Sequence, residues 1–459
     1  ECVELAERLA ERIGSELAVP TYLYAEAART PKRRRLPDIR EGEYEALEEK
    51  LKKPEFKPDF GPVKFNAKAG ATAFGARNFL IAYNVNLNTT SVKLAKRIAF
   101  QVREKGGYKR GKRGAVLRGK DGKPLRGPGM FKQVQGTAWF IEEYGRAQIT
   151  VNILDIDASP LHKVYDACCD LAHDMGLRVT GSEIVGMVPR RVLTEAGRYF
   201  LKKQGSTTGV SRDELARVGV MSLGLSDVSG FDPQKKIIEE QFMEKTPLVD
   251  STLKGFTEEL ASNSAAPGGG SVAALAGALG AGLSSMVGAL TFEKKGFEKL
   301  RGEMEKLGVE AQRLKELQLA AIDADTEAFK KVLEGMRRPK DTKVQKAARA
   351  KAVLEASKHA TIVPLETLER AKPTLELAAQ AARMGNPNSL SDAGVAALMG
   401  RAAALGAYFY VLINLAGIDD KPWCRKIRAK ADNLLDAAQK KADQVDRLVL
   451  ETLRAQAPK

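Results

Sequence analysis

The sequence contains few residues of the kinds that build disulfide frameworks or soft-metal sites. It has only four cysteines and three histidines in 459 residues. The cysteines show no spacing typical of a zinc knuckle or a disulfide framework, and the histidines lie in helical patterns without metal-ligand spacing. We therefore expect no metal and a reducing, cytoplasmic setting. These residues are Cys2, Cys168, Cys169, Cys424, His162, His173 and His359.

The sequence begins with Glu1 rather than methionine, and none of its segments has the pattern of a signal peptide. Glu1 opens directly into an amphipathic helix pattern, without the apolar segment and cleavage site of a signal peptide. We expect the natural N-terminus to lie upstream of Glu1.

No zinc finger, basic zipper or aromatic-studded RNA-binding strand accompanies the formal charge of +16. A surface this basic attracts anions, so nucleic acid and a small polyanionic substrate are alternative partners. The Gly/Lys/Arg-rich stretch 103–132 has too little apolar content for a core element. It is interpreted as a basic loop, either a solvated hairpin or an electrostatic guide for an anionic substrate.

The length of the chain and its 44% hydrophobic and 29% charged residues indicate two or three globular domains. Residues 1–240 mix helix and strand patterns, which predicts an α/β or α+β part. Strands are expected at 21–24, 79–87 and 147–153, the last half-exposed because its apolar and polar residues alternate. Helices are expected at 2–17, 36–51, 161–175 and 192–203.

From about Leu248 the strand patterns disappear, and Ala, Leu, Lys and Glu recur at helical period. This predicts an all-α helical bundle over 248–459, preceded by a linker at 241–247. The uncharged run 271–291 has the length of a membrane span. Because most of its residues are Ala, Gly and Ser, we expect a central bundle helix whose small side chains let neighbouring helices pack closely.

A glycine-rich turn opens that helix, and its residues are Pro267, Gly268, Gly269, Gly270 and Ser271. Glycines leave backbone amides uncovered, and a helix start concentrates unpaired N–H groups, so the turn is a candidate anion site. It lacks the Lys-Ser/Thr of a nucleotide-binding P-loop, and a purely structural turn is the alternative.

Two carboxylates, Asp323 and Asp325, lie in the middle of a later helical pattern. Residues two apart on a helix point about 200° apart, so only one of them is expected to face the bundle interior. An inward carboxylate costs free energy unless it is paired or used, which makes it a candidate acid or base. The alternative is that both are solvated.

Two further loops are candidate binding segments. The loop 61–70 precedes the apolar strand and carries two lysines, and such loops are as often plain turns as ligand sites. Its residues are Gly61, Pro62, Val63, Lys64, Phe65, Asn66, Ala67, Lys68, Ala69 and Gly70. The polar loop 385–394 leads into an apolar helix that Ser391 or Asp392 is expected to cap.

In this order along the whole chain, the segments resemble the formiminotransferase-cyclodeaminase family. The transferase-like motifs are Thr21-Tyr22-Leu23-Tyr24-Ala25-Glu26-Ala27-Ala28, Glu41-Gly42-Glu43-Tyr44-Glu45-Ala46-Leu47, Asp59-Phe60-Gly61-Pro62, Gly75-Ala76-Arg77-Asn78-Phe79-Leu80-Ile81-Ala82 and Phe231-Asp232-Pro233. The cyclodeaminase-like motifs are Pro267-Gly268-Gly269-Gly270-Ser271, Asp323-Ala324-Asp325, Gly406-Ala407-Tyr408-Phe409 and Val411-Leu412-Ile413-Asn414-Leu415.

The resemblance implies a multidomain fold and two reactions. An α+β, mixed-sheet transferase part, divided into 1–79 and 80–240, would precede an all-α cyclodeaminase domain at 248–459. The first would move a formimino group from N-formimino-L-glutamate to N5 of tetrahydrofolate, a late step of histidine breakdown. The second would close N10 onto the formimino carbon and release ammonia, giving 5,10-methenyltetrahydrofolate. A polyglutamylated tetrahydrofolate co-substrate and a homo-oligomer, dimer or higher, are further expectations.

The resemblance also implies roles for residues. Asp325 would be the general acid/base, with Asp323 its outward partner and second choice. The loop 61–70 would grip folate in the transferase, the turn 268–271 would contact it in the second domain, and the basic surface would hold a polyglutamate tail between the two sites.

One motif of the family is absent, which leaves alternatives open. The transferase histidine segment, of the type His-Lys-Gly-Glu-His-Pro-Arg, does not occur in these 459 residues. Either it lies upstream of Glu1, or the protein has only a working cyclodeaminase. The loop 385–388 also resembles stand-alone methenyltetrahydrofolate cyclohydrolases, so cyclohydrolase activity is one alternative function and nucleic-acid binding is another.

Overall fold

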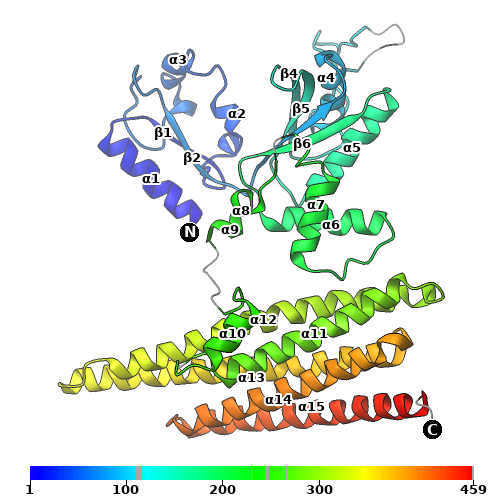
Figure 1. Ribbon diagram of the computed structural model, residues 1–459. Helices are drawn as coiled ribbons and strands as arrows, with labels where there is room; N and C mark the ends of the chain where they lie inside the picture. The colour runs from blue at the N-terminus through cyan, green and yellow to red at the C-terminus, as the bar shows by residue number, and fades with distance from the viewer. Residues whose placement is uncertain (110, 112–114, 229, 243–247, 265, 457–459) are drawn as a thin grey trace. The chain divides into compact units, whose positions relative to one another are not determined.

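The computed structural model describes residues 1–459 except 110, 112–114, 229, 243–247, 265 and 457–459. The chain forms two compact units (Figure 1). The first contains residues 1–189 and 224–230, and the second contains 190–223 and 231–459. The predicted multidomain class, a sheet-containing part followed by an all-α bundle, is confirmed.

The first unit contains two sheets and the helices that cover them. Its elements are α1 (Cys2–Glu16), β1 (Thr21–Ala25), η1 (Pro31–Arg33), α2 (Leu36–Ile39), α3 (Leu47–Leu51), η2 (Pro54–Phe56), β2 (Thr72–Ala76), β3 (Ile81–Leu87), α4 (Val92–Val102), β4 (Val134–Ile141), β5 (Arg146–Ile153), α5 (Leu161–Asp174) and β6 (Val179–Val185). Strands β1 and β2 pair in parallel, and the second sheet is antiparallel with the order β4-β5-β3-β6.

Strand β5 differs from its prediction in burial. Its alternating pattern predicts one solvated face, yet Gln148 on the polar face is 1% exposed and the neighbouring Asn86 on β3 is fully buried. Gln148 Nε2 donates to Asn86 Oδ1 at 2.9 Å, and Trp139 Nε1 on β4 donates to Gln148 Oε1 at 3.1 Å. Polar side chains therefore bury one another on this face, which alternation alone cannot reveal.

The helix predicted at 36–51 is wrong, because the segment forms two short helices, α2 and α3, with a turn between them. Gly42 has a φ of 78°, in the left-handed region that favours glycine and interrupts a helix. The Lys50 ammonium, on a side chain that is only 8% exposed, donates to the carbonyls of Ile39 and Glu41 at 2.7 Å each. These bonds satisfy carbonyls that a continuous helix would have paired internally.

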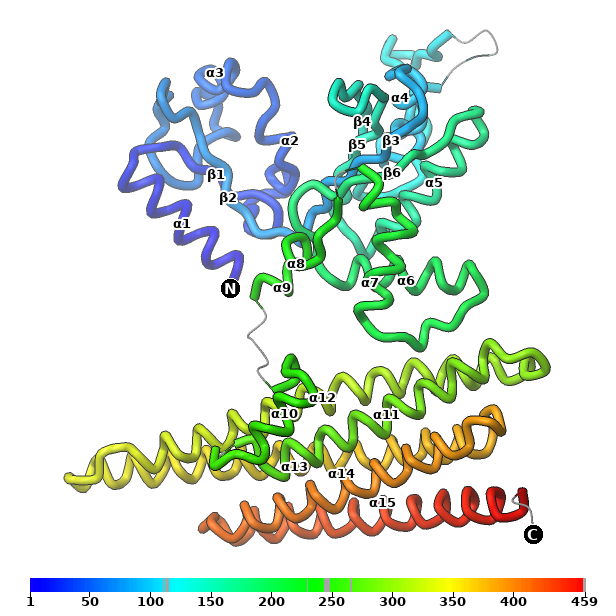
Figure 2. Tube along the Cα trace, viewed as in Figure 1, coloured from blue at the N-terminus to red at the C-terminus, as the bar shows by residue number. Residues whose placement is uncertain are grey.

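The second unit is entirely helical among its described residues. Its elements are α6 (Arg190–Lys203), α7 (Arg212–Ser222), α8 (Pro233–Lys236), α9 (Ile238–Phe242), α10 (Leu253–Leu260), α11 (Gly269–Glu293), η3 (Glu298–Leu300), α12 (Arg301–Arg337), α13 (Lys343–Met384), η4 (Pro387–Ser389), α14 (Leu390–Ala416) and α15 (Lys421–Gln456). The long helices α11 to α15 lie side by side as a bundle (Figure 2). Its core is rich in alanine and leucine, for example Leu368, Leu375 and Ala404.

Helix α11 is the predicted central helix, and close packing through small residues is confirmed. A Cβ added at Gly277 would lie 2.5 Å from Gln318 Nε2 on α12, and one at Gly280 would lie 2.8 Å from Ala396 O on α14. By length and composition alone, two helical segments are apolar enough to cross a membrane: α11 and Pro387–Ala416. The core helices of a bundle meet the same criterion.

Two predicted segments lie partly outside the described residues. In the linker at 241–247, Gln241 and Phe242 end α9, and the other five residues are not described. In the basic stretch 103–132, isolated bridges join Tyr108 to Arg126 and Arg118 to Pro124. The described part of that stretch therefore has a hairpin-like path, while residues 110 and 112–114 lie outside the description.

Candidate active site

The N-terminus of α11 and the middle of α12 bring two sequence motifs together. A Cβ added at Gly270 would lie 2.4 to 2.6 Å from the carboxyl atoms of Asp325, so only glycine leaves room for that side chain. Ser271 Oγ donates to Ile322 O at 2.9 Å and lies 3.3 Å from Asp325 Oδ2. The glycine turn and the aspartate, more than fifty residues apart in sequence, thus form one corner.

A third helix contributes Tyr410 to this corner. The N–H of Gly269 donates to Tyr410 Oη at 2.8 Å, and a Cβ at Gly269 would lie 2.9 Å from that oxygen. The phenol therefore satisfies one of the orphan amides at the start of α11 and stays available as a donor itself. We did not select Tyr410 from the sequence. The sequence feature that could have indicated it is a tyrosine within an apolar helix, because a buried phenol requires a hydrogen-bond partner.

Asp325 is partly shielded from solvent, and this changes its acidity. Burial raises the pKa of Asp325 above the ordinary carboxyl value of 3.8, while hydrogen bonds from the side chain and backbone of Ser271 oppose the rise. Desolvation disfavours the carboxylate, whereas hydrogen bonds to the charged form favour it. The net upward shift gives Asp325 a proton-carrying form at higher pH than a solvated aspartate, as general acid/base chemistry requires.

Asp323, the expected outward partner, has a structural environment, and the alternative that both aspartates are solvated is wrong. Its two carboxylate oxygens accept the backbone N–H groups of Leu248 and Val249 at 3.1 and 3.2 Å. Both of those residues pack against the cluster formed by Ala274, Ala321 and Ile322. Asp323 therefore fixes the chain that enters the bundle, whereas Asp325 lies beside the glycine turn.

The loop 61–70 lies in the first unit and is held from within. Tyr44 Oη donates to Ala67 O at 2.8 Å, and the ring of Tyr44 lies 5.5 Å from that of Phe65. Asn66 Oδ1 accepts the N–H groups of Lys68 and Ala69, at 3.1 and 3.0 Å. The side chains of Lys64 and Lys68 are exposed, so the loop presents two cations on an ordered backbone.

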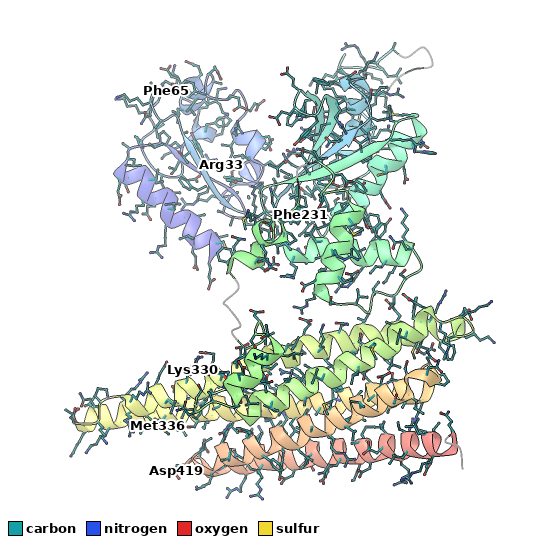
Figure 3. The ribbon with its side chains drawn as sticks, in the orientation of Figure 1. Arg33, Phe65, Phe231, Lys330, Met336 and Asp419 are labelled. Atoms are coloured by element: carbon teal, nitrogen blue, oxygen red, sulfur yellow. The ribbon has the colours of Figure 1, made fainter. Side chains whose placement is uncertain are left out.

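Arg33, in the same unit (Figure 3), stabilises the residues that lead into this loop. Its Nη1 donates to Asp59 Oδ2 at 2.7 Å, and the two side chains are 12% and 6% exposed. The same carboxylate oxygen accepts the N–H of Leu23 at 2.8 Å. Asp59 is therefore a structural anchor between β1 and the loop, because both of its partners are parts of the fold.

The loop 385–394 lies away from Asp325. Asn386 N–H donates to Thr291 Oγ1 at 2.9 Å, near the C-terminal end of α11 and about 30 Å along that helix from Ser271. The predicted caps are wrong, because α14 begins at Leu390 and places Ser391 and Asp392 inside its first turn. Asn386 instead caps the short helix η4, accepting the N–H of Asn388.

No cluster of three or more His, Cys, Asp or Glu side chains arranged to hold a metal ion occurs in the described part of the chain. The four cysteines are free thiols. The functional groups that meet at the corner are a carboxyl group, a phenol, a serine hydroxyl and backbone amides.

The chain matches three family models. Residues 1–77 match the N-terminal subdomain of the formiminotransferase domain, residues 82–243 match the formiminotransferase domain, and residues 252–433 match formiminotransferase-cyclodeaminase. The formimidoyltransferase-cyclodeaminase of Mus musculus is 40% identical over 461 residues, covering 99% of this chain and 81% of the mouse protein. Its Dictyostelium discoideum counterpart is 37% identical over 97% of this chain and 79% of that protein.

Relatives of each half also exist separately. The glutamate formimidoyltransferase of Thermoplasma acidophilum is 38% identical over 45% of this chain and 62% of its own length. The methenyltetrahydrofolate cyclohydrolase of Methylorubrum extorquens is 36% identical over 41% of this chain and 91% of its own length. The crystal structure of a formiminotetrahydrofolate cyclodeaminase from Thermotoga maritima covers 44% of this chain and 98% of its own, with 26% identity and a TM-score of 0.40.

A bifunctional relative that is 40% identical along nearly the whole chain, and separate models matched in the same order, agree with the motifs in the sequence. The chain belongs to the formiminotransferase-cyclodeaminase family.

Proposed function

We propose that this chain transfers the formimino group of N-formimino-L-glutamate to tetrahydrofolate and then cyclises the product to 5,10-methenyltetrahydrofolate with release of ammonia. Support for the second step comes from the corner at the start of α11, where Asp325, Tyr410 and Ser271 meet. The comparisons favour this pair of reactions over the cyclohydrolase and nucleic-acid-binding alternatives.

The cyclisation needs one proton carrier, and Asp325 has the properties for this role. N10 attacks the carbon of the protonated formimino group, and its proton passes to the Asp325 carboxylate. The same proton then passes to the departing nitrogen as the carbon–nitrogen bond breaks, which leaves ammonia and the cationic methenyl product. One carboxyl group acting first as base and then as acid balances the step, and a raised pKa makes Asp325 a better proton carrier for both tasks than a solvated aspartate.

The turn 268–271 is proposed to lie against the folate in this step. Glycines at 269 and 270 let the Tyr410 phenol and the Asp325 carboxyl lie directly against the first turn of α11, so a flat ring system bound beside this turn would have both groups within reach. The Tyr410 hydroxyl donates a hydrogen bond to the substrate, because its oxygen already accepts the N–H of Gly269 and its O–H remains available.

The transferase step is proposed to use the loop 61–70 as its folate clamp. The exposed Lys64 and Lys68 offer cations to the glutamate tail, which we expect to be polyglutamylated. Replacing both lysines by alanine is expected to weaken folate binding with little change in stability, because exposed side chains contribute little to folding. Unchanged affinity for a triglutamate folate would remove the loop from the site.

The protein is also proposed to be a cytoplasmic homo-oligomer. Helices α11 and α14 carry large apolar side chains that are exposed in the single chain, among them Leu279 at 50%, Phe409 at 61% and Ile413 at 68%. Large apolar side chains exposed in this way are typical of surfaces that contact another subunit. A monomeric mass by light scattering at micromolar concentration would contradict the oligomer.

The decisive experiment is ammonia release by Asp325→Asn. With 5-formiminotetrahydrofolate as substrate, we expect kcat to fall about 10²- to 10⁴-fold, because the amide cannot carry the proton. Glu327→Gln is the matched control, since Glu327 is exposed on the same helix and pairs with Lys330 at its surface. An Asp325→Asn protein that releases ammonia at the parental rate would end the assignment, and methenyl hydrolysis without ammonia would favour the cyclohydrolase.

A further inference from the structure

The antiparallel sheet of the first unit borders a pocket of about 530 Å³ that contains an arginine, Arg146. The pocket is lined by Leu87, Asn88, Thr89, Thr90, Gly145, Arg146 and Thr180. A volume in this range suits a small ligand or one end of a larger one. Its polar groups are hydroxyls, an amide and a guanidinium, so they favour an anion.

Arg146 is held in place by neutral partners. Its Nε donates to Tyr144 O at 3.0 Å, and its Nη1 donates to Thr180 Oγ1 at 2.9 Å. Within the part of the chain that the structure describes, no carboxylate lies within ion-pair distance of this guanidinium. These two bonds orient the planar guanidinium and leave Nη2 and the second N–H of Nη1 for a ligand, so that Nη1 and Nη2 can bind a carboxylate with two parallel hydrogen bonds.

A carboxylate of the same sheet, that of Glu183, is already occupied. Glu183 on β6 accepts Tyr144 Oη at 2.7 Å and Gln148 Nε2 at 2.7 Å, one bond to each oxygen. Those bonds hold Glu183 in the polar network of the sheet. Because it does not pair with Arg146, the positive charge of the pocket is not neutralised by the fold itself.

A second arginine, Arg178, is joined through its backbone to the pocket residue Asn88. Asn88 Oδ1 accepts the N–H of Arg178 at 2.7 Å, and Arg178 O accepts the N–H of Asn88 at 3.0 Å, which joins the ends of β3 and β6. The Arg178 side chain is exposed. Two arginines, one fixed and one free to adjust, match a ligand with two carboxylates.

We propose that the Arg146 pocket binds the carboxylates of a glutamyl group. This inference rests on the proposed function for the identity of the ligand, because formiminoglutamate and the folate tail both carry this group. Arg146 binds one carboxylate through its fork, the hydroxyl of Thr90 and the amide of Asn88 contribute further hydrogen bonds, and Arg178 attracts the second carboxylate.

Trp139 provides a direct reporter of binding. The protein has two tryptophans, and Trp139 on β4 is bonded to Gln148, two residues from Arg146 on β5. In a Trp423→Phe background, titration with glutarate is expected to change the Trp139 fluorescence in a saturable way, and the neutral glutaramide is expected to have no effect. Equal responses to the two compounds would overturn the proposal.

Substitutions locate the site. Arg146→Gln is expected to weaken glutarate binding about tenfold or more, the usual loss for a charge-assisted pair. Arg97→Gln, which removes an exposed arginine from α4 of the same unit, is the charge-matched control and is expected to bind as the parent. Thr180→Val keeps the guanidinium but removes one of its anchors, so a smaller loss is expected. Parental binding by both Arg146→Gln and Thr180→Val would overturn the proposal.

Two ligand series distinguish the sources of the glutamyl group. If the folate tail is the ligand, p-aminobenzoyl-triglutamate should bind at least about tenfold more tightly than p-aminobenzoyl-glutamate. If formiminoglutamate is the ligand, it should bind more tightly than either, and failure of all three to compete with glutarate would overturn the proposal. The titration needs no turnover, so its result is independent of the Asp325 test, which concerns the other unit.

Discussion

The turn at the start of α11 and the loop 61–70 need glycine for different physical reasons. At the start of α11, added Cβ atoms at Gly269 and Gly270 would strike the side chains of Tyr410 and Asp325. At Gly61, φ is 81° and an added Cβ would lie 2.4 Å from Val19 O, a backbone atom. In the first segment glycine leaves space for functional side chains, whereas in the second it allows a backbone conformation and a backbone contact that a side chain would prevent.

The largest expected effect tests this difference directly. Gly270→Ala should reduce ammonia release at least about a hundredfold, because the methyl group displaces the Asp325 carboxyl, and angstrom-scale misplacement has that cost. The bundle should stay helical by circular dichroism, since alanine is a better helix former than glycine. Gly61→Ala should do the opposite, lowering the melting temperature of the first unit while the rate of ammonia release stays parental.

A Gly270→Ala protein with parental activity would show that the corner tolerates a shifted carboxyl. An equally stable Gly61→Ala protein would show that the loop adapts to the new side chain. Either result would contradict the claim that the two segments need glycine for these different reasons.

The sequence predicts the helices better than it predicts this corner. The pattern at 271–291 lies within α11, and the bundle follows from helical periodicity that needs no knowledge of distant residues. The meeting of Gly270 with Asp325 depends on how α11 and α12 align along each other, which periodicity does not specify. The position of Tyr410 at the corner depends in the same way on how α14 aligns with α11. The strand β4 is not predicted from the sequence, because its pattern, with Trp139 and Phe140 both exposed, does not alternate cleanly.

The next effect concerns the phenol at the corner. Tyr410→Phe should lower kcat about tenfold, about 1.4 kcal/mol, through loss of one hydrogen bond to the substrate. Its ring still fills the space above Gly269, so the fold should be retained, although the N–H of Gly269 loses its acceptor. Steady-state kinetics distinguish the roles: a change confined to stability, with kcat and KM parental, would make Tyr410 a structural cap.

Tyr408 is the matched control for that variant. It lies two residues earlier on α14, and its Oη donates to Asp432 on α15 rather than toward the glycine turn. Tyr408→Phe should therefore cost stability through the lost bond and leave ammonia release unchanged. If both variants slow the reaction equally, the effect reflects α14 as a whole and not the corner.

The smallest effect is on stability and has a defined dependence on pH. Because burial raises the pKa of Asp325 in the folded chain, folding favours its protonated form. That contribution is complete below the unfolded value of 3.8 and is lost as pH rises through the folded pKa. Asp325→Asn cannot ionise, so near neutral pH its melting temperature should exceed that of the parent, and the difference should shrink as the pH is lowered. Calorimetry across this pH range measures the difference in melting temperature. If Asp325→Asn melts below the parent at neutral pH, the Ser271 hydrogen bonds outweigh the cost of burying the carboxylate. Asp325 would then be a stabilising structural group like Asp323.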